Sequence, residues 1–196
     1  MTEFSAPPEE PMGLVRAWFD HAVANAAQRP GAMALATADA DGHTSNRMVA
    51  VLDIRDTGLV FATHAVSRKG RDIAVTGWSS GVLYWREIDW QVIVSGPTHP
   101  LPDAESDAIW AGRSAGALPM SVATQQSAPL LDEPALRARV QELSQVGSAL
   151  NRPATWLGYL LEPDSVEFWQ AAPDHFYPRL RYERSGSGWR SQRLQP

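Results

Sequence analysis

Short apolar runs separated by tight turns are the feature that most constrains how this chain can fold. The runs at 32–38, 44–54 and 59–63 are divided by turn residues at 39–42 and 56–58, which contain Asp-Gly and Thr-Gly pairs. β-strands joined by short loops show this spacing, whereas a core helix needs a longer apolar stripe. The pattern predicts an antiparallel meander in this part of the chain.

Helical periodicity occurs in other parts of the sequence. Apolar residues recur with helical spacing over 11–28, and Arg29-Pro30-Gly31 ends that pattern. Further helices are predicted over 67–74, over 102–112 and from Asp132 to about residue 146, where Asp132 is a suitable N-cap and Pro134 suits the first turn. The remaining strands are predicted at 81–85, 90–97, 155–161, 165–170, 176–183 and 189–194.

These elements predict a mainly β or α+β fold, a barrel-like sheet with peripheral helices. We expect residues 1–10 to form a flexible N-terminal tail and residues 11–196 to form a single domain. No apolar run approaches the ~20 residues that span a bilayer, and the N-terminus does not resemble a secretory signal, so we expect a cytoplasmic protein.

Composition excludes several classes of function. The chain has 196 residues and no cysteine, which removes disulfides, thiolate metal sites and thiol nucleophiles. A formal net charge of −5 argues against a general nucleic-acid binder. The sequence contains no HExxH motif and no Walker loop, and we expect no metal site.

One basic segment is placed where an anion could bind. Lys69 is the only lysine, and Ser67-Arg68-Lys69 follows the strand that ends at Ala62-Thr63. A helix N-terminus favours anions, and Arg and Lys add charge-assisted donors. With Arg47 from the preceding strand, this segment could hold a phosphate; the alternative is a set of solvated surface cations.

Amide and aromatic residues give weaker signals. Gln91, Gln126 and Ser127 could bind the polar edge of a heteroaromatic ring, or they could be ordinary strand-end and turn residues. Trp169 could stack on a planar ligand or fill the core. The residues alone leave both alternatives open.

Taken in order, several motifs resemble the pyridoxamine 5′-phosphate oxidase family of FMN-binding split barrels. They are Arg47-Met48-Val49, Ala62-Thr63 with Ser67-Arg68-Lys69, Gln91 to Val94, Gln126-Ser127, Glu167-Phe168-Trp169, Arg179 and Trp189 to Pro196. The resemblance covers about residues 14–196. Within the family, the segments 81–87 and 179–196, together with 119–121, are most similar to the FMN oxidases of phenazine biosynthesis.

The resemblance implies a split β-barrel homodimer with FMN at the subunit interface. It implies that Arg47, Arg68 and Lys69 hold the FMN phosphate with Thr63 and Ser127 nearby. The other implied cofactor-binding residues are Met48, Ala62, Gln91 and Gln126, with Trp169 and Arg179 contributed by the second subunit.

The substrate side departs from the vitamin B6 enzymes of this family. Leu52 stands where they have Lys, Ile109 beside Trp110 where they have Tyr, and His175 and Tyr177 where they have Arg and His; Arg113 is retained. We therefore expect a larger, more apolar pocket and an FMN-dependent oxidase of a reduced phenazine carboxylic acid, with O₂ as acceptor and H₂O₂ as product. The alternatives are a pyridoxine/pyridoxamine 5′-phosphate oxidase and a non-catalytic FMN-binding protein.

Overall fold

The computed structural model describes residues 3–146 and 150–196. Its helices are α1 (Pro11–Ala24), α2 (Arg68–Thr76), α3 (Asp103–Ala111), the 3₁₀ turn η1 (Ala115–Ala117), α4 (Leu118–Ala123) and α5 (Glu133–Ser144). Its strands are β1 (Ala32–Ala38), β2 (Thr44–Ala50), β3 (Asp53–Arg55), β4 (Gly58–His64), β5 (Trp78–Trp85), β6 (Trp90–Pro100), β7 (Trp156–Leu161), β8 (Ser165–Gln170), β9 (Arg179–Ser185) and β10 (Gly188–Leu194). None of the described helices has the length and apolarity that crossing a membrane requires.

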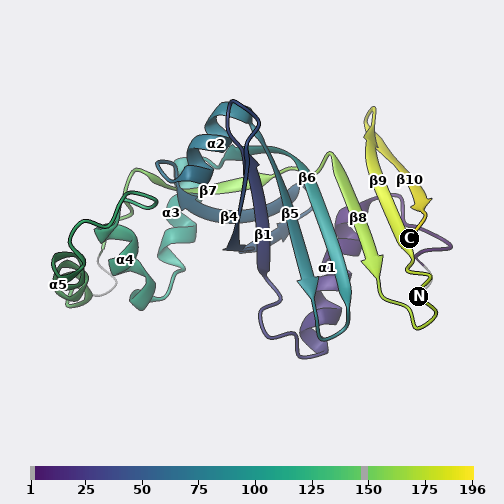
Figure 1. Cartoon of the computed structure of the whole chain (residues 1–196), viewed down its shortest axis with the longest axis horizontal. Coiled ribbons are helices and arrows are strands. Elements are labelled where there is room, and N and C mark those ends of the chain that lie inside the picture. Colours follow the sequence, from purple (N-terminus) through teal and green to yellow (C-terminus); the bar gives the residue numbers. More distant parts are fainter. Residues whose placement is uncertain (1–2, 147–149) are drawn as a thin grey trace.

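The strands form one curled antiparallel sheet (Figure 1). Its main path runs β10-β9-β8-β6-β5-β1-β2, while β4 pairs with β3 and β7. Strand β6 joins the two parts because residues 90–95 pair with β8 and residues 98–100 pair with β7. The sheet curls where β6 changes partner, and this makes a half-barrel.

Gly96 permits that change of partner. A Cβ atom at Gly96 would lie 2.0 Å from the Glu162 carbonyl oxygen and 2.6 Å from the Asp164 backbone nitrogen. Any side chain there would collide with backbone, so the strand can turn into the second part of the sheet only with glycine.

The main core lies between α1 and the long sheet. Trp18 from α1 packs with ring centroids 4.5 Å from Trp90 and 5.0 Å from Phe168. Val15 and Ala22 are fully buried on the same helix face. Burial of this apolar stripe stabilises α1, which has no side-chain cap at its N-terminus.

A second, smaller core organises the helical segment that projects from one end of the barrel (Figure 1). Trp110 on α3 packs edge-on against Trp156 on β7, with centroids 5.1 Å apart. Leu118 and Leu143 bring α4 and α5 onto the same cluster. This packing positions the α4–α5 loop over the start of α2.

The mainly β prediction is confirmed, but the predicted meander is wrong beyond its hairpins. Strand β1 lies between β2 and β5, and β4 lies in the other part of the sheet. The run 44–54 divides because the Val51 N–H donates to the Gly31 carbonyl, whereas the Leu52 N–H donates to the Val60 carbonyl. Adjacent residues therefore bond to different parts of the sheet.

Several predicted boundaries also change. Helix α1 ends at Ala24 rather than Gln28, and β9 begins at Arg179, after the Pro178 that lacks a donor. In the predicted tail, the described residues touch the core: Phe4 packs edge-on against Trp18, and the Pro8 carbonyl accepts from the Tyr182 hydroxyl. The mobility of residues 1–10 stays a prediction.

Candidate functional site

Lys69 lies at the centre of the predicted phosphate-binding residues. Ser67 caps α2 by accepting a hydrogen bond from the Gly70 N–H, and this turn directs Lys69 inward, where its side chain is buried. The Lys69 ammonium donates to Thr63 Oγ1 at 3.1 Å and to Gln126 Oε1 at 3.1 Å. Its partners are therefore neutral oxygens.

Lys69 lacks a counter-charge. Across residues 3–146 and 150–196, no carboxylate lies within ion-pair distance of its ammonium. Burial, with the positive charge of Arg47 as a smaller cause, lowers the pKa of Lys69 below its ordinary value. A buried, unpaired cation is costly. An anionic ligand at this position would remove that cost.

Arg47 contributes a second cation from β2. Its guanidinium donates to Thr37 Oγ1 at 2.7 Å and to the Leu35 carbonyl at 3.1 Å. The Asp72 carboxylate is 3.9 Å away and accepts at 2.6 Å from Thr37. Burial lowers the pKa of Arg47, and Asp72 only partly offsets this. Positive charge is thus in excess around α2.

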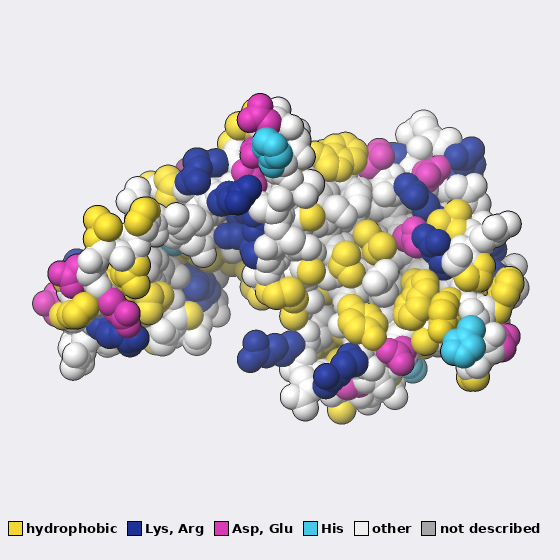
Figure 2. Space-filling view, viewed as in Figure 1, with side chains coloured by type: hydrophobic (Ala, Val, Ile, Leu, Met, Phe, Trp, Pro, Cys, Tyr) yellow, Lys and Arg dark blue, Asp and Glu magenta, His cyan; other side chains and the backbone are white. Residues whose placement is uncertain are grey.

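The α4–α5 loop completes the cluster. Ser127 Oγ accepts from the Arg68 N–H at 3.2 Å, and Thr63 Oγ1 donates to Gln126 Oε1 at 2.9 Å. Ser127 has a φ of +72°, a strained conformation for a non-glycine residue that tends to persist at functional sites. The structure brings together the predicted residues Arg47, Thr63, Arg68, Lys69, Gln126 and Ser127, which we call the cation cluster. Figure 2 shows Lys and Arg side chains gathered beside α2.

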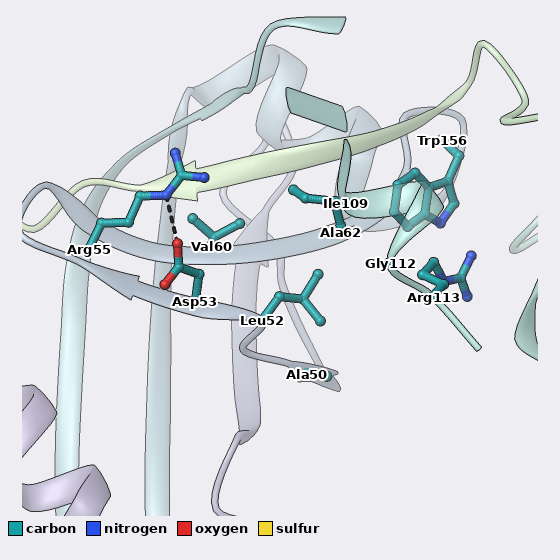
Figure 3. Close-up of a pocket in the computed structure, with 10 residues that line it drawn as sticks. All are labelled: Ala50, Leu52, Asp53, Arg55, Val60, Ala62, Ile109, Gly112, Arg113 and Trp156. Atoms are coloured by element: carbon teal, nitrogen blue, oxygen red, sulfur yellow. Dashed lines mark hydrogen bonds and ion pairs between the residues drawn. The ribbon is translucent and has the colours of Figure 1, made fainter. Parts of the chain in front are cut away.

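A cavity of about 480 Å³ includes Ala62, which directly precedes Thr63 of the cation cluster on β4 (Figure 3). It is lined by Ala50, Leu52, Asp53, Arg55, Val60, Ala62, Ile109, Gly112, Arg113 and Trp156. The predicted residues Leu52, Ala62 and Arg113 therefore share one pocket. Its middle is apolar and charged groups lie at its ends.

Arg113 is the cation at one end of this cavity. Its guanidinium lies 4.9 Å from the Trp156 ring centroid and 5.1 Å from that of Trp110. It donates to Ser121 Oγ at 3.0 Å, and no carboxylate of the described residues pairs with it. Burial lowers its pKa. Two aromatic faces thus hold a guanidinium in place whose charge is free to meet an anion.

The opposite end carries a different charge arrangement. Arg55 Nε lies 3.0 Å from Asp53 Oδ2, and Arg55 Nη1 lies 2.7 Å from Glu105 Oε2. These hydrogen bonds, with Glu105 the larger cause, raise the pKa of Arg55. Two carboxylates flank one guanidinium, so this end is negative.

His64 lies between the cation cluster and the cavity. Its Nδ1 is 3.1 Å from Thr155 Oγ1, and its buried Nε2 has no hydrogen-bond partner among residues 3–146 and 150–196. Burial lowers the pKa of His64, and the charges of Arg113 and Lys69 lower it further. Burial and the two nearby cations therefore disfavour protonation of this imidazole.

A third group of predicted residues lies on the sheet. Gln91 on β6 is paired in register with Trp169 on β8, which is paired with Arg179 on β9. Arg179 Nη2 lies 2.6 Å from Glu167 Oε1. In the loop that follows β8, His175 Nδ1 lies 2.7 Å from the Tyr177 hydroxyl, and the Tyr177 ring contacts Trp169 at 5.3 Å between centroids.

Two predicted residues lie outside these groups. Met48 is 62 % exposed and follows Arg47 on β2, so its side chain projects from the other face of the strand. Trp110 is buried behind Trp156, and its Nε1 donates to the Leu150 carbonyl at 2.8 Å. Ligand contacts for both stay predictions.

Sequence reasoning missed Asp53, Arg55, His64 and Trp156. Charged residues beside a turn and single aromatic or histidine residues at strand ends are common without function. A separate group, Asp39, Asp41 and His43, brings its ligand atoms within 4.8 Å of one another at an exposed turn. There Asp39 Oδ1 accepts from the Asp41 and His43 N–H groups, a turn geometry that accounts for the cluster.

Comparison with known proteins gives the family. The chain belongs to the pyridoxamine 5′-phosphate oxidase family, whose model matches residues 19–147. A second model, described as the pyridoxine 5′-phosphate oxidase C-terminal dimerisation region, matches residues 156–196 and supports homodimerisation. The predicted family is therefore confirmed.

Two named relatives have different activities. The chain is 47 % identical over 194 residues to a dihydrophenazinedicarboxylate synthase of Burkholderia lata, covering 99 % of this chain and 92 % of the relative. It is 39 % identical over 188 residues to a pyridoxine/pyridoxamine 5′-phosphate oxidase of Paraburkholderia phymatum, covering 95 % and 89 %.

Solved structures of related proteins support the same family assignment. PhzG from Burkholderia lata, in complex with tetrahydrophenazine-1-carboxylic acid, matches with a TM-score of 0.98 and 46 % identity, covering 100 % of this chain and 97 % of that one. An FMN-binding protein of Nostoc punctiforme matches with a TM-score of 0.77 at 17 % identity, covering 92 % and 97 %, which shows a shared fold. The split-barrel prediction is confirmed.

Proposed function

We propose that this protein is an FMN-dependent oxidase of a reduced phenazine carboxylic acid, acting in the cytoplasm in phenazine biosynthesis. The observation that carries the cofactor assignment is the buried Lys69 ammonium, which has neutral partners and no carboxylate partner in the described part of the chain. Arg47, Arg68 and Lys69 would hold the FMN phosphate, and Thr63, Gln126 and Ser127 would supply polar partners. A phosphate provides the negative charge that this cluster lacks.

A second copy of the chain would complete the site. Arg47 lies on β2 and Arg179 on β9, with β8, β6, β5 and β1 between these strands in the sheet. Trp169 and Arg179 of the same chain are therefore poorly placed to share a ligand with the cation cluster. Hydrophobic side chains gather in groups on the sheet face over β5, β6 and β8, as expected for a contact surface (Figure 2). We infer that Gln91, Trp169 and Arg179 serve the site of the partner copy.

The cavity would receive the substrate. Leu52, Val60 and Ile109 provide apolar walls for a flat ring system, and Arg113 would bind its carboxylate. His175 and Tyr177, through the partner copy, would close the other side. The walls exclude water and orient the rings, which is the main catalytic task when product aromatisation drives the reaction.

FMN, when bound, supplies a two-electron acceptor that O₂ can reoxidise. Overall, the substrate ring loses two electrons and two protons, and O₂ gains them to give H₂O₂. The residues of this chain hold the two anionic groups and keep the reacting ring planes in place.

The second candidate is a pyridoxine/pyridoxamine 5′-phosphate oxidase, which the relatives at 39 % identity favour. Against it, Leu52 and Ile109 line the cavity and neither offers a phosphate a partner. A dianionic phosphate would meet only Arg113 as an unpaired cation among the described cavity residues.

Anaerobic reduction of the bound flavin tests this choice. The FMN-loaded protein would be mixed with reduced phenazine-1-carboxylic acid and, separately, with pyridoxamine 5′-phosphate, and the visible flavin band would be followed. We expect bleaching by the phenazine alone, and H₂O₂ on admission of O₂. Bleaching by pyridoxamine 5′-phosphate alone would establish the second candidate. A flavin that neither donor reduces would support an FMN-binding protein without this activity.

A further inference from the structure

One buried atom beside the site has no hydrogen bond. Among residues 3–146 and 150–196, His64 Nε2 is the only buried side-chain nitrogen or oxygen without a partner. His64 is 5 % exposed, and an unmade hydrogen bond in such a place costs free energy. The other ring nitrogen, Nδ1, lies 3.1 Å from Thr155 Oγ1 and fixes the orientation of the ring. With Nδ1 donating to Thr155, Nε2 holds a lone pair that nothing in the described chain uses.

The place of His64 in the sheet connects the two cationic parts of the site. It ends β4 directly after Thr63, whose Oγ1 accepts from the Lys69 ammonium at 3.1 Å. It is paired in register with Trp156 of β7, and the Arg113 guanidinium lies 4.9 Å from the Trp156 ring centroid (Figure 3). His64 therefore adjoins both the cation cluster and the cation proposed to bind the substrate carboxylate.

Both charges that act on the His64 ring are positive. Burial is the largest cause that lowers its pKa, followed by Arg113 from the segment after α3 and Lys69 from α2. The other elements beside the ring, β7 and α4, present the neutral residues Thr155 and Ser121, and the Ser121 backbone favours the protonated ring. Lys69 and Arg113 have no carboxylate partner within the described residues. An anion bound at either cation would therefore offset a charge that opposes protonation of His64.

We propose that His64 is a positioning residue, which takes up a proton at Nε2 when a carboxylate binds Arg113. One N–H bond forms with a proton from solvent, and no other covalent bond changes. The protonated ring is favoured by the Ser121 backbone, and Ser121 Oγ already accepts from Arg113 Nη1 at 3.0 Å. The substrate thereby strengthens the contact between β4 and α4 that holds its own binding cation. The inference rests on the proposed function for the identity of the ligand.

Proton uptake has a defined effect on affinity. Where the complex binds more protons than the free protein, the ligand binds more tightly as the pH falls. We expect phenazine-1-carboxylate to bind the FMN-loaded protein at least about threefold more tightly at about pH 5.5 than at about pH 8, a range in which its carboxylate stays ionised. Phenazine-1-carboxamide has the same rings without the charge, so its affinity should stay constant, and it also reports any effect of pH on the bound flavin.

Isothermal titration calorimetry measures the proton directly. Titrations in two buffers with different ionisation enthalpies give the number of protons taken up for each ligand bound. At about pH 6 we expect proton uptake with phenazine-1-carboxylate and none with phenazine-1-carboxamide.

A substitution assigns the proton to one residue. His64→Gln keeps a side-chain amide that can bond to Thr155 but cannot titrate. We expect this variant to bind phenazine-1-carboxylate without proton uptake and with an affinity that no longer follows the pH. His99→Gln is the matched control, because His99 is an exposed histidine on β6. It should keep the wild-type proton uptake.

Equal pH dependence for the carboxylate and the carboxamide would overturn the proposal, and this result needs no variant to fold. Proton uptake that persists in His64→Gln would also overturn it, because another group of the site, such as His175, would then carry the proton. Loss of the uptake in His99→Gln would have the same meaning. If neither phenazine binds, the proposed function itself fails and the inference fails with it. Binding of both ligands without proton uptake contradicts the inference alone.

Discussion

Three arginines of the C-terminal ribbon (β9 and β10) have acidic partners, whereas the buried cations around α2 and Trp156 have fewer or none. The ribbon's Arg184 and Arg193 lie over the rings of Trp189 and Phe4 instead. On β9 and β10, Arg179 pairs with Glu167, and Arg181 and Arg190 both pair with Glu183. Around α2 and Trp156, Lys69 and Arg113 have only neutral hydrogen-bond partners among the described residues. Arg47 has one carboxylate, at 3.9 Å.

This difference separates cations that already pair with a carboxylate of the same chain from cations that still lack a counter-charge. A guanidinium with an acidic partner is already neutralised and fixes one strand to another. A buried cation with only hydroxyl, amide or aromatic partners remains destabilising until an anion arrives, and the ligand then gains the interaction. The comparison therefore predicts that changes in the two regions affect different measurements.

The largest effect is expected at the cation cluster. Replacing Arg68 and Lys69 with Ala removes two charge-assisted partners of the phosphate and should weaken FMN binding by at least about 100-fold. Arg71→Ala is the matched control on the same helix, because its exposed side chain donates to the Val66 carbonyl. Flavin fluorescence titration measures both. Wild-type affinity in the double variant would defeat the assignment.

Arg113→Met should act on the substrate and spare the cofactor. Loss of the guanidinium should weaken phenazine-1-carboxylate binding by about tenfold or more, because one charge-assisted bond is removed. Uncharged phenazine should bind as before, and so should FMN. The fold should tolerate the change, since no carboxylate among the described residues is left unpaired. Equal losses for phenazine and its carboxylate would instead indicate a damaged pocket.

Substitutions of ion-paired residues in the C-terminal ribbon should lower the stability of the chain and leave ligand binding by the same chain unchanged. Glu167→Ala leaves Arg179 without its acidic partner in a partly buried position and should lower the free energy of unfolding by ~1–3 kcal/mol. Glu133→Ala breaks the exposed pair with Arg137 on α5 and should cost only ~0–0.5 kcal/mol. Urea denaturation gives both values. Equal costs would remove the distinction between buried and exposed pairs.

The smallest effect concerns His64 and pH. Its pKa is lower in the folded chain than the ordinary value of 6.5, so the unfolded chain binds more protons as the pH falls below that value. The contribution of His64 to stability is therefore full above pH 6.5 and decreases as the pH falls toward the lowered pKa. His64→Asn should remove this part of the pH dependence. An unchanged stability profile below pH 6.5 would show that His64 does not titrate as described.

The sequence was most informative where one period governs one element. The predictions over 32–38, an apolar run, and over 165–170 matched the observed bounds of β1 and β8. The prediction of a single run over 44–54 was wrong, because the hydrogen-bond partner changes between Val51 and Leu52 while both residues are apolar. Strand order failed for a related reason, since local pattern does not specify that β5 rather than β4 lies beside β1.

For the site, residues that are close in sequence were predicted correctly, whereas contacts between distant segments were not predicted. Ser67-Arg68-Lys69 could be interpreted directly, because the cap and the cations are consecutive. The cavity combines Leu52, Ile109 and Trp156 from three distant segments, and its negative end depends on Asp53 meeting Glu105 across Arg55. Such pairings arise from the curl of the sheet and have no local signature.

We infer that the unpaired cations around α2 bind the phosphate of FMN. The most direct measurement is the affinity of the wild-type chain for FMN against riboflavin, which has the same ring system and no phosphate. The account predicts that FMN binds at least about 100-fold more tightly and that riboflavin affinity is indifferent to the Arg68 and Lys69 substitutions. Equal affinity for the two flavins would contradict it.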